Sequence, residues 1–175
     1  MSENLRYAPS GHLSECYMGY QCGYGRYYTW AGAMDSVRTG CGNGKTCNAS
    51  GVLQGRGACP VGWHLPDTTE LNYLFVNIGG ASVAGTKLKA SSGWSSGNGT
   101  DNYGFSAAPR GYLNWDPSDG NYHDVGDHAY FWTYNESNTQ NTATSARAMS
   151  LYSGANVNVG SMPKTYLYTV RCLKN

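Results

Sequence analysis

The six cysteines constrain this chain more than any other feature of its sequence. Six cysteines allow many pairings, but their spacing favours three disulfides: Cys16–Cys22, Cys41–Cys47 and Cys59–Cys172. The first two would close short loops, and the third would tie the C-terminal end of the chain to its middle. A long closed loop stabilises a domain mainly by restricting its unfolded state. Three disulfides also predict an oxidising, extracellular compartment.

Zinc ligation is the alternative role for these cysteines. Structural zinc sites favour closely spaced pairs such as Cys-x-x-Cys, and the sequence contains no such pair. We therefore expect disulfides, and no metal ion, at the cysteine positions.

The core has to be built largely from aromatic side chains. The 175 residues include 11 Leu, 9 Val, 3 Phe and a single Ile, against 15 Tyr and 5 Trp. So few aliphatic residues would indicate disorder if the net charge were high, but the formal net charge is only +1. We expect one folded domain over 1–175, with aromatic rings in its core.

Charge and hydropathy exclude several classes of protein. A nucleic-acid binder needs a surplus or a stripe of Lys and Arg, and none is present. No apolar run is long enough to span a membrane, so we expect no membrane insertion by this domain. The first residues do not resemble a signal peptide, so we expect that any export signal has been removed.

Two segments have helical spacing. Asp67 and Glu70 form a capping-box pattern ahead of apolar residues on one face, and a Gly-Gly pair follows, which predicts a helix over 67–78. Aromatic and apolar residues spaced along 27–35 predict a shorter helix there.

After residue 85 the pattern changes to short alternating segments between turns, which predicts strands. In the last of them Tyr166, Tyr168, Val170 and Cys172 would share one inward face. Two loops rich in Asp, Asn, Gly and Ser, at 110–128 and 153–164, are longer than a compact hairpin needs. Loops of this kind often carry binding sites.

A series of motifs resembles the Fibrobacter succinogenes major paralogous domain. In chain order they are MSENLRY (1–7), YGRYYTWAGAMD (24–35), CPVGWHLP (59–66), GTKLK (85–89), GNGTDNYGFSA (97–107) and VRC (170–172). The resemblance covers nearly the whole chain. It implies an exported bacterial protein, because many members are surface lipoproteins or parts of larger adhesive proteins. We expect this chain to be part of a longer surface protein.

The motif WHLP at 63–66, followed by a capped helix, also resembles formylglycine-generating enzymes. That resemblance implies a C-type-lectin-like fold of the α+β class, in which two helices pack on small antiparallel sheets with long loops. The three disulfides would staple this fold.

Enzymatic residues are not evident. An oxidase site of the formylglycine-generating type needs a reactive cysteine pair near the C-terminus, and only Cys172 lies there. The four histidines are scattered and could complete a nucleophilic triad only by chance. His64 is most simply a packed, hydrogen-bonded residue. We expect a protein that is not an enzyme.

Calcium is the one cofactor that the residues leave open, and otherwise we expect none. Asp116, Asp119, Asp124 and Asp127 supply hard oxygen ligands in one loop. No EF-hand spacing occurs, and the sugar-coordinating triplets of calcium-dependent lectins are absent, so solvated carboxylates are the simpler interpretation. A transition metal on His123 with Asp127 or His128 is a weaker alternative.

Aromatic and amide side chains in the loop-rich half predict a binding surface on the two long loops and the adjoining strand ends. Its candidate residues are Tyr112, Trp115, Tyr122, Tyr134, Asn135, Asn138, Arg147, Tyr152, Asn156 and Asn158. Trp132, on a predicted strand, is expected in the core, and loop rings such as Trp115 and Tyr122 at the surface. Turn chemistry is the alternative role for the asparagines.

The predicted function is that of a monomeric extracellular binding module on the outer surface of a bacterium. It would mediate adhesion to a polysaccharide, a glycan, or a host or other cell-surface protein. The alternative is a passive structural domain of a larger surface protein or pilus.

Overall fold

The computed structural model describes residues 2–11, 13–17, 19–47, 55–114 and 122–175. Its elements, in chain order, are β1 (Ser14–Tyr17), β2 (Gln21–Tyr28), α1 (Trp30–Ala33), α2 (Ser36–Thr39), β3 (Trp63–His64), α3 (Thr68–Asn77), α4 (Ala81–Leu88), β4 (Tyr112–Leu113), β5 (Tyr122–His123), β6 (Ala129–Glu136), β7 (Ser145–Leu151), β8 (Val157–Pro163) and β9 (Leu173–Lys174). This mixed architecture of short helices and small antiparallel sheets confirms the α+β prediction.

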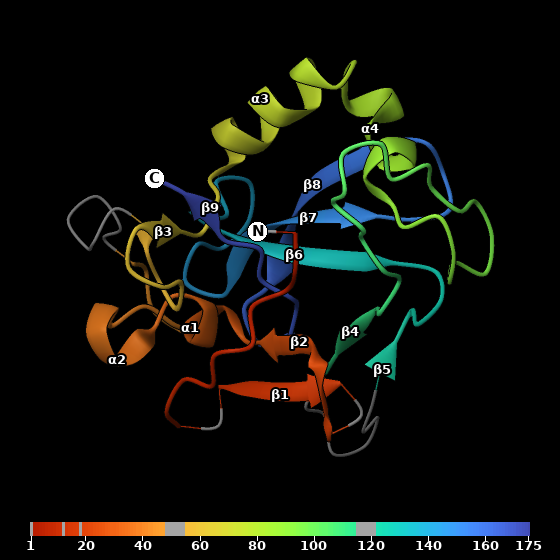
Figure 1. Cartoon of the computed structure of the whole chain (residues 1–175). Coiled ribbons are helices and arrows are strands. Elements are labelled where there is room, and N and C mark those ends of the chain that lie inside the picture. The colour runs from red at the N-terminus through yellow and green to blue at the C-terminus, as the bar shows by residue number, and fades with distance from the viewer. Residues whose placement is uncertain (1, 12, 18, 48–54, 115–121) are drawn as a thin grey trace.

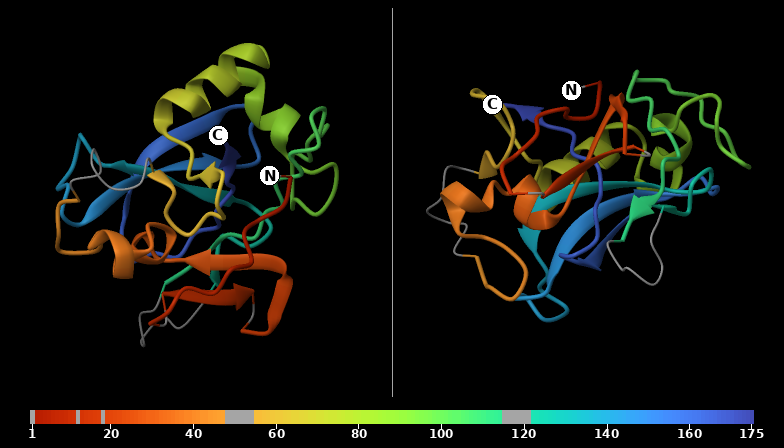
Figure 2. Two further views of the ribbon diagram at one scale, coloured as in Figure 1. Left: turned by 60° about the vertical axis from the view of Figure 1, so that its left-hand side comes forward. Right: turned by 90° about the horizontal axis from the view of Figure 1, so that it is seen from below.

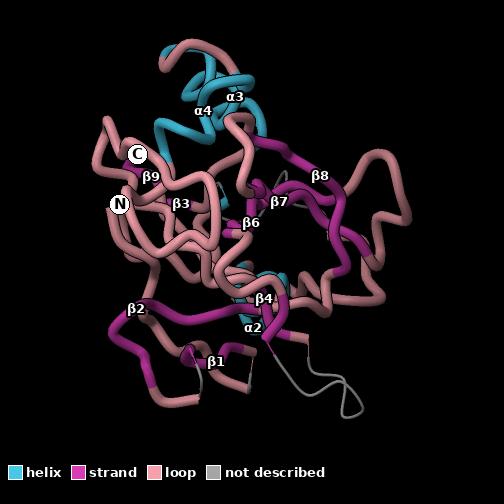
Figure 3. The backbone as a smooth tube through the Cα atoms, turned by 90° about the vertical axis from the view of Figure 1, so that its right-hand side faces the viewer, coloured by secondary structure: helices cyan, strands magenta, loops and turns pink. Residues whose placement is uncertain are grey.

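A three-stranded antiparallel sheet, in the order β6–β7–β8, lies at the centre of the domain. Three two-stranded sheets, β1–β2, β3–β9 and β4–β5, surround it. Figures 1 and 3 show α3 and α4 at the top of the molecule and the β1–β2 hairpin at the bottom, with the central sheet between them. The two ends of the chain lie near each other (Figure 2), and the amide of Leu5 donates to the carbonyl of Val170.

Helix α3 confirms the prediction for 67–78. The Asp67 side chain accepts from the amide of Glu70, and the Glu70 side chain accepts from the amide of Asp67, which completes the capping box. The side chains of Leu71 and Phe75 are buried on the inner face of α3. Gly79 and Gly80 end it with positive φ angles, as their position predicts.

The predictions for two other segments were partly wrong. Tyr27 and Tyr28 end strand β2, and the helix α1 that follows has only four residues, capped by Thr29. The apolar spacing at 27–35 arises because both faces of this segment are buried. After α3 the chain forms a further helix, α4, which was not predicted, and only its last residues lie in the region after residue 85 where strands were expected. Gly80 is both the end of one helix and the N-cap of the next.

The segment 166–172 also differs from the prediction. Instead of a strand with one inward face, it forms isolated bridges from Leu167, Tyr168 and Thr169 to three different segments. Leu167, Thr169 and Arg171, which would face outward from such a strand, are buried too. Neighbouring segments cover both sides of the chain here.

Aromatic side chains fill the main core, as the composition predicts. Trp132, Trp30 and Tyr28 are almost completely buried. The Trp132 indole N–H donates to the Tyr28 carbonyl at 2.8 Å, and that of Trp30 donates to the Thr133 carbonyl at 3.0 Å. Each buried indole therefore has a partner. A second, more aliphatic core lies between α3, α4 and the central sheet.

All three predicted disulfides are present: Cys16–Cys22, Cys41–Cys47 and Cys59–Cys172. They indicate an oxidising, non-cytoplasmic compartment. Among the helices of the described residues, none combines the length and the apolar character that crossing a bilayer requires.

Removing the long-range disulfide should cost more stability than removing a short one. The bridged residues are 113 positions apart in Cys59–Cys172 and 6 apart in Cys41–Cys47. In the chain-entropy model the double variant Cys59→Ser/Cys172→Ser should lose about 5 kcal/mol of unfolding free energy, and Cys41→Ser/Cys47→Ser about 2 kcal/mol. Urea unfolding measures both losses. Equal losses would contradict this account of the C-terminal tie.

Candidate functional site

Two aromatic residues of the predicted loop surface are packed into the domain. Tyr112 stacks on Tyr166 with ring centroids 4.9 Å apart. The Tyr122 hydroxyl donates to the carbonyl of Cys16 at 3.0 Å, and its ring meets that of Tyr17 edge-on at 5.4 Å. The Tyr122 contacts join β5 to the β1–β2 hairpin, and the Tyr112 contact joins β4 to the segment 166–172. The Tyr122 ring, expected at the surface, is therefore half-buried.

Three further predicted residues have structural partners. The Asn135 side chain accepts from the amide of Thr68 at 2.8 Å, at the start of α3. Arg147 donates to the Val159 carbonyl at 2.9 Å on the neighbouring strand. Tyr134 is half-buried against the main core.

The remaining predicted residues do not form one surface. Asn138 is exposed in the β6–β7 connection, whereas Asn156 and Asn158 are exposed at the start of β8. Because the strands are antiparallel, these two connections lie at opposite ends of the sheet. Tyr152 is half-buried, and Trp115 lies outside the described residues.

The acidic loop is only partly described. Asp116 and Asp119 lie outside the described residues, while Asp124 and Asp127 are exposed. Asp124 accepts from the Tyr130 hydroxyl at 2.8 Å, which occupies one of its oxygens. Within the described ranges, no group of three or more His, Cys, Asp or Glu side chains is placed to hold a metal ion.

A polar pocket of about 220 Å³ lies elsewhere, where the N-terminal segment, β2, the segment 106–110 and the C-terminal segment meet. We call it the arginine pocket. Its side chains include Glu3, Asn4, Arg6, Tyr24, Ser106, Arg110 and Arg171. None of them is among the predicted site residues, although Arg110 begins the predicted loop 110–128.

Arg171 forms the inner wall of the arginine pocket and is only 7% exposed. Its Nε donates to the side-chain oxygen of Asn4 at 2.6 Å, and its Nη1 donates to the Phe105 carbonyl at 2.5 Å. The guanidinium lies 4.5 Å from the Phe105 ring centroid. Burial lowers the pKa of Arg171 to about 10, although the charges of Asp101 and Glu3 raise it. A buried cation held by neutral groups favours an anion beside it.

Arg110 forms the outer wall and has no hydrogen bond or ion pair from its side chain to any described residue. Its guanidinium stacks over Tyr24, 4.1 Å from the ring centroid, and lies 5.0 Å from that of Tyr17. The Tyr27 hydroxyl fixes the Arg110 backbone by donating to its carbonyl at 2.6 Å. Tyr24 itself is 55% exposed, and Arg110 is half-buried beside it.

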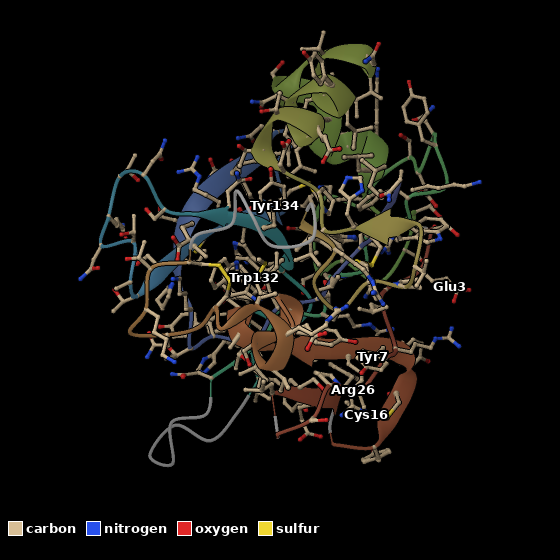
Figure 4. The ribbon with its side chains drawn as sticks, turned by 90° about the vertical axis from the view of Figure 1, so that its left-hand side faces the viewer. Glu3, Tyr7, Cys16, Arg26, Trp132 and Tyr134 are labelled. Carbon is tan, nitrogen blue, oxygen red and sulfur yellow. A yellow bond between two sulfur atoms is a disulfide. The ribbon has the colours of Figure 1, made fainter. Side chains whose placement is uncertain are left out.

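The N-terminal segment closes the pocket because it lies directly on β2. The amide of Arg26 donates to the carbonyl of Leu5, and a Cβ at Gly25 would lie 2.3 Å from the Cβ of Asn4. Gly25 also has a φ of 93°, so both the close approach and the backbone conformation require glycine. Figure 4 shows Glu3 at the right-hand edge of the molecule, above the hairpin strands that carry Arg26 and Cys16.

Comparison with known proteins identifies the family. The family model of the Fibrobacter succinogenes major domain matches residues 1–174. The chain belongs to this family. No curated protein and no solved structure matches it.

Sequence reasoning about this Fibrobacter succinogenes major domain missed the arginine pocket. Asn4, Tyr24 and Arg171 all lie in the family motifs. They served there only to recognise the family and were not predicted to bind a ligand. The available signal was Arg171, a charged residue within a run of apolar and aromatic residues. Three-dimensional contacts were needed to bring Arg110 to the same place.

An apolar cavity of about 230 Å³ adjoins the pocket and shares Arg171 with it. Leu71, Leu74, Phe131 and Met149 line it between α3 and the central sheet. Its apolar walls come mainly from the second core, together with Trp132 and Cys172 of the main core.

His64 is a hydrogen-bonded structural residue, with 15% of its side chain exposed. Its Nε2 lies 2.8 Å from a Glu70 carboxylate oxygen, and its Nδ1 lies 2.6 Å from the Asn175 side-chain oxygen. Burial lowers the pKa of His64, but the hydrogen bonds to Asn175 and Glu70, with the charges of Glu70 and Asp67, raise it above its ordinary value overall.

The raised pKa of His64 makes a pH-dependent contribution to stability. Protonated His64 favours the folded state fully below its ordinary pKa of about 6.5, and this contribution is lost as pH rises through the raised folded pKa. Between about pH 5.5 and about pH 8.5, the domain should therefore lose more unfolding free energy than its His64→Gln variant does. Urea unfolding at both pH values tests this, and identical losses would show that folding does not raise the pKa of His64.

Proposed function

We propose that this domain is a non-catalytic extracellular binding module, that it serves adhesion to carbohydrate, and that its ligand site is the arginine pocket. The observation that carries the proposal is the juxtaposition of Arg110 and Tyr24 at the mouth of a polar cavity. Unused guanidinium donors and an exposed ring are the groups that hold sugar hydroxyls and sugar faces. The cavity, about 220 Å³, suits one sugar residue at a time.

The absence of catalysis is part of this proposal. The lining of the pocket, as far as it is described, contains no histidine or cysteine, and its one carboxylate, Glu3, is paired with Arg6 at 2.7 Å. A pocket of this composition offers donors for binding but no activated nucleophile.

We also propose that the architecture is C-type-lectin-like. Two features support this: a helix pair beside a three-stranded antiparallel sheet, and a disulfide that ties the C-terminal segment to the region before α3. In keeping with this architecture, we expect the isolated domain to be monomeric.

Replacing Tyr24 with Ala should weaken carbohydrate binding while leaving the fold intact. Removing a ligand-contacting aromatic side chain commonly costs about 2 kcal/mol, which is more than tenfold in affinity. Tyr73→Ala is the matched control, because Tyr73 is 67% exposed on α3, away from the pocket. Glycan arrays and polysaccharide pull-down assays measure binding, and melting temperatures verify folding.

Two results would contradict this proposal. If the wild-type domain bound no glycan or polysaccharide, a passive structural role would be favoured. If Tyr24→Ala and Tyr73→Ala bound equally well, the site would lie elsewhere on the domain.

A further inference from the structure

Arg171 is a buried cation that makes no ion pair with a described carboxylate, although the charges of Asp101 and Glu3 act on it from farther away. No carboxylate of the described residues lies within ion-pair distance of its guanidinium, and its bonded partners, Asn4 and Phe105, are neutral. Its Nη2 has no hydrogen-bond acceptor in the described part of the chain. A buried charge left in this state is costly unless an anion reaches it.

Arg110 supplies a second cation to the same pocket. Stacking on Tyr24 positions its guanidinium without using any of its N–H donors. Arg6 also lines the pocket, but Glu3 neutralises it, and the nearby Asp101 carboxylate accepts from the amide and hydroxyl of Ser106. The lining itself therefore carries a net charge of about +2, or about +1 with the nearby Asp101 included, in an almost neutral protein.

We propose that the arginine pocket recognises the carboxylate of an acidic sugar residue, so that the ligand is a polysaccharide containing uronic acids. Arg171 and Arg110 would donate to the carboxylate oxygens, since planar guanidinium forks match carboxylates in geometry and charge. The Tyr24 ring would contact the sugar ring. This inference rests on the proposed carbohydrate-binding function and specifies its ligand.

The size and charge of the site favour an acidic sugar over larger polyanions. Nucleic acids require a basic surface that follows many phosphates, whereas this positive charge is confined to a pocket of about 220 Å³. A sulfated sugar would present an anion of similar charge, and the experiment below separates it from a carboxylated one.

Isothermal titration calorimetry with trigalacturonate tests the proposal, and the methyl ester of the same trimer is the neutral control ligand. We expect the wild-type domain to bind the acid at least about tenfold more tightly than the ester, because charge-assisted hydrogen bonds are lost with the charge. Raising NaCl from roughly 50 mM to roughly 500 mM should weaken binding of the acid much more than that of the ester.

Arg110→Gln is the decisive variant, since the Arg110 side chain only stacks on other rings and its loss should leave the fold intact. We expect it to bind the acid at least about tenfold more weakly than the wild type, and Arg110→Lys to fall between them because Lys lacks the fork. Lys45→Gln is the control, because it removes one positive charge from an exposed side chain outside the pocket.

Each outcome decides the matter. Equal binding of acid and ester, or no effect of Arg110→Gln, would overturn the acidic-sugar inference while leaving carbohydrate binding intact. Tighter binding of a sulfated trisaccharide than of trigalacturonate would replace carboxylate by sulfate recognition. Failure of every saccharide to bind would overturn the proposed function as well.

Discussion

The extended segment 166–172 runs through the centre of the domain, and both the fold and the candidate site depend on it. Its backbone exchanges hydrogen bonds with Tyr28 and Leu113 and pairs with Phe131. Cys172 then ties this segment to Cys59. Elements that are distant in sequence thus meet along a single stretch of chain, which explains why a domain with such small sheets has a continuous core.

The same segment places Arg171 at the pocket. The neighbours of Arg171 are both buried: Val170 accepts from the amide of Leu5, and Cys172 is disulfide-bonded. The guanidinium therefore has little freedom, and Asn4 and Phe105 fix its orientation. A site built on a packed segment and a disulfide is preorganised, so little ordering entropy would oppose ligand binding. The rim is more adaptable, since Arg6 and Tyr24 are exposed.

Local sequence signals predicted the parts of the fold that local chemistry determines. The capping box of Asp67 and Glu70 fixed the start of α3, and cysteine spacing indicated the disulfide pairs. Apolar spacing failed at 27–35 and 166–172, where both faces of the chain are buried and periodicity no longer distinguishes an inner face from an outer one. Helix α4 was missed because its small residues carry little periodic signal.

Interactions between distant residues could not be predicted in the same way. Lys89, although almost fully buried, donates to the backbone carbonyls of Gly97, Tyr152, Ser153 and Gly154. Lys164 is buried against Glu136 and the Trp30 ring. Neither lysine has a sequence neighbour that indicates burial. The arginine pocket is of the same kind, because Arg110 and Arg171 are brought together only by the packing of β2 and the N-terminal segment.

The central claim is that Arg110 and Arg171 bind the ligand directly, and NMR of the arginine side-chain Nε–H groups tests it most directly. During titration with trigalacturonate, the Nε–H signals of Arg110 and Arg171 should shift together and saturate, while that of Arg147 on β7 stays unchanged. Shifts confined to Arg147 and to the side-chain amides of Asn138, Asn156 or Asn158, with Arg110 and Arg171 unmoved, would contradict the account.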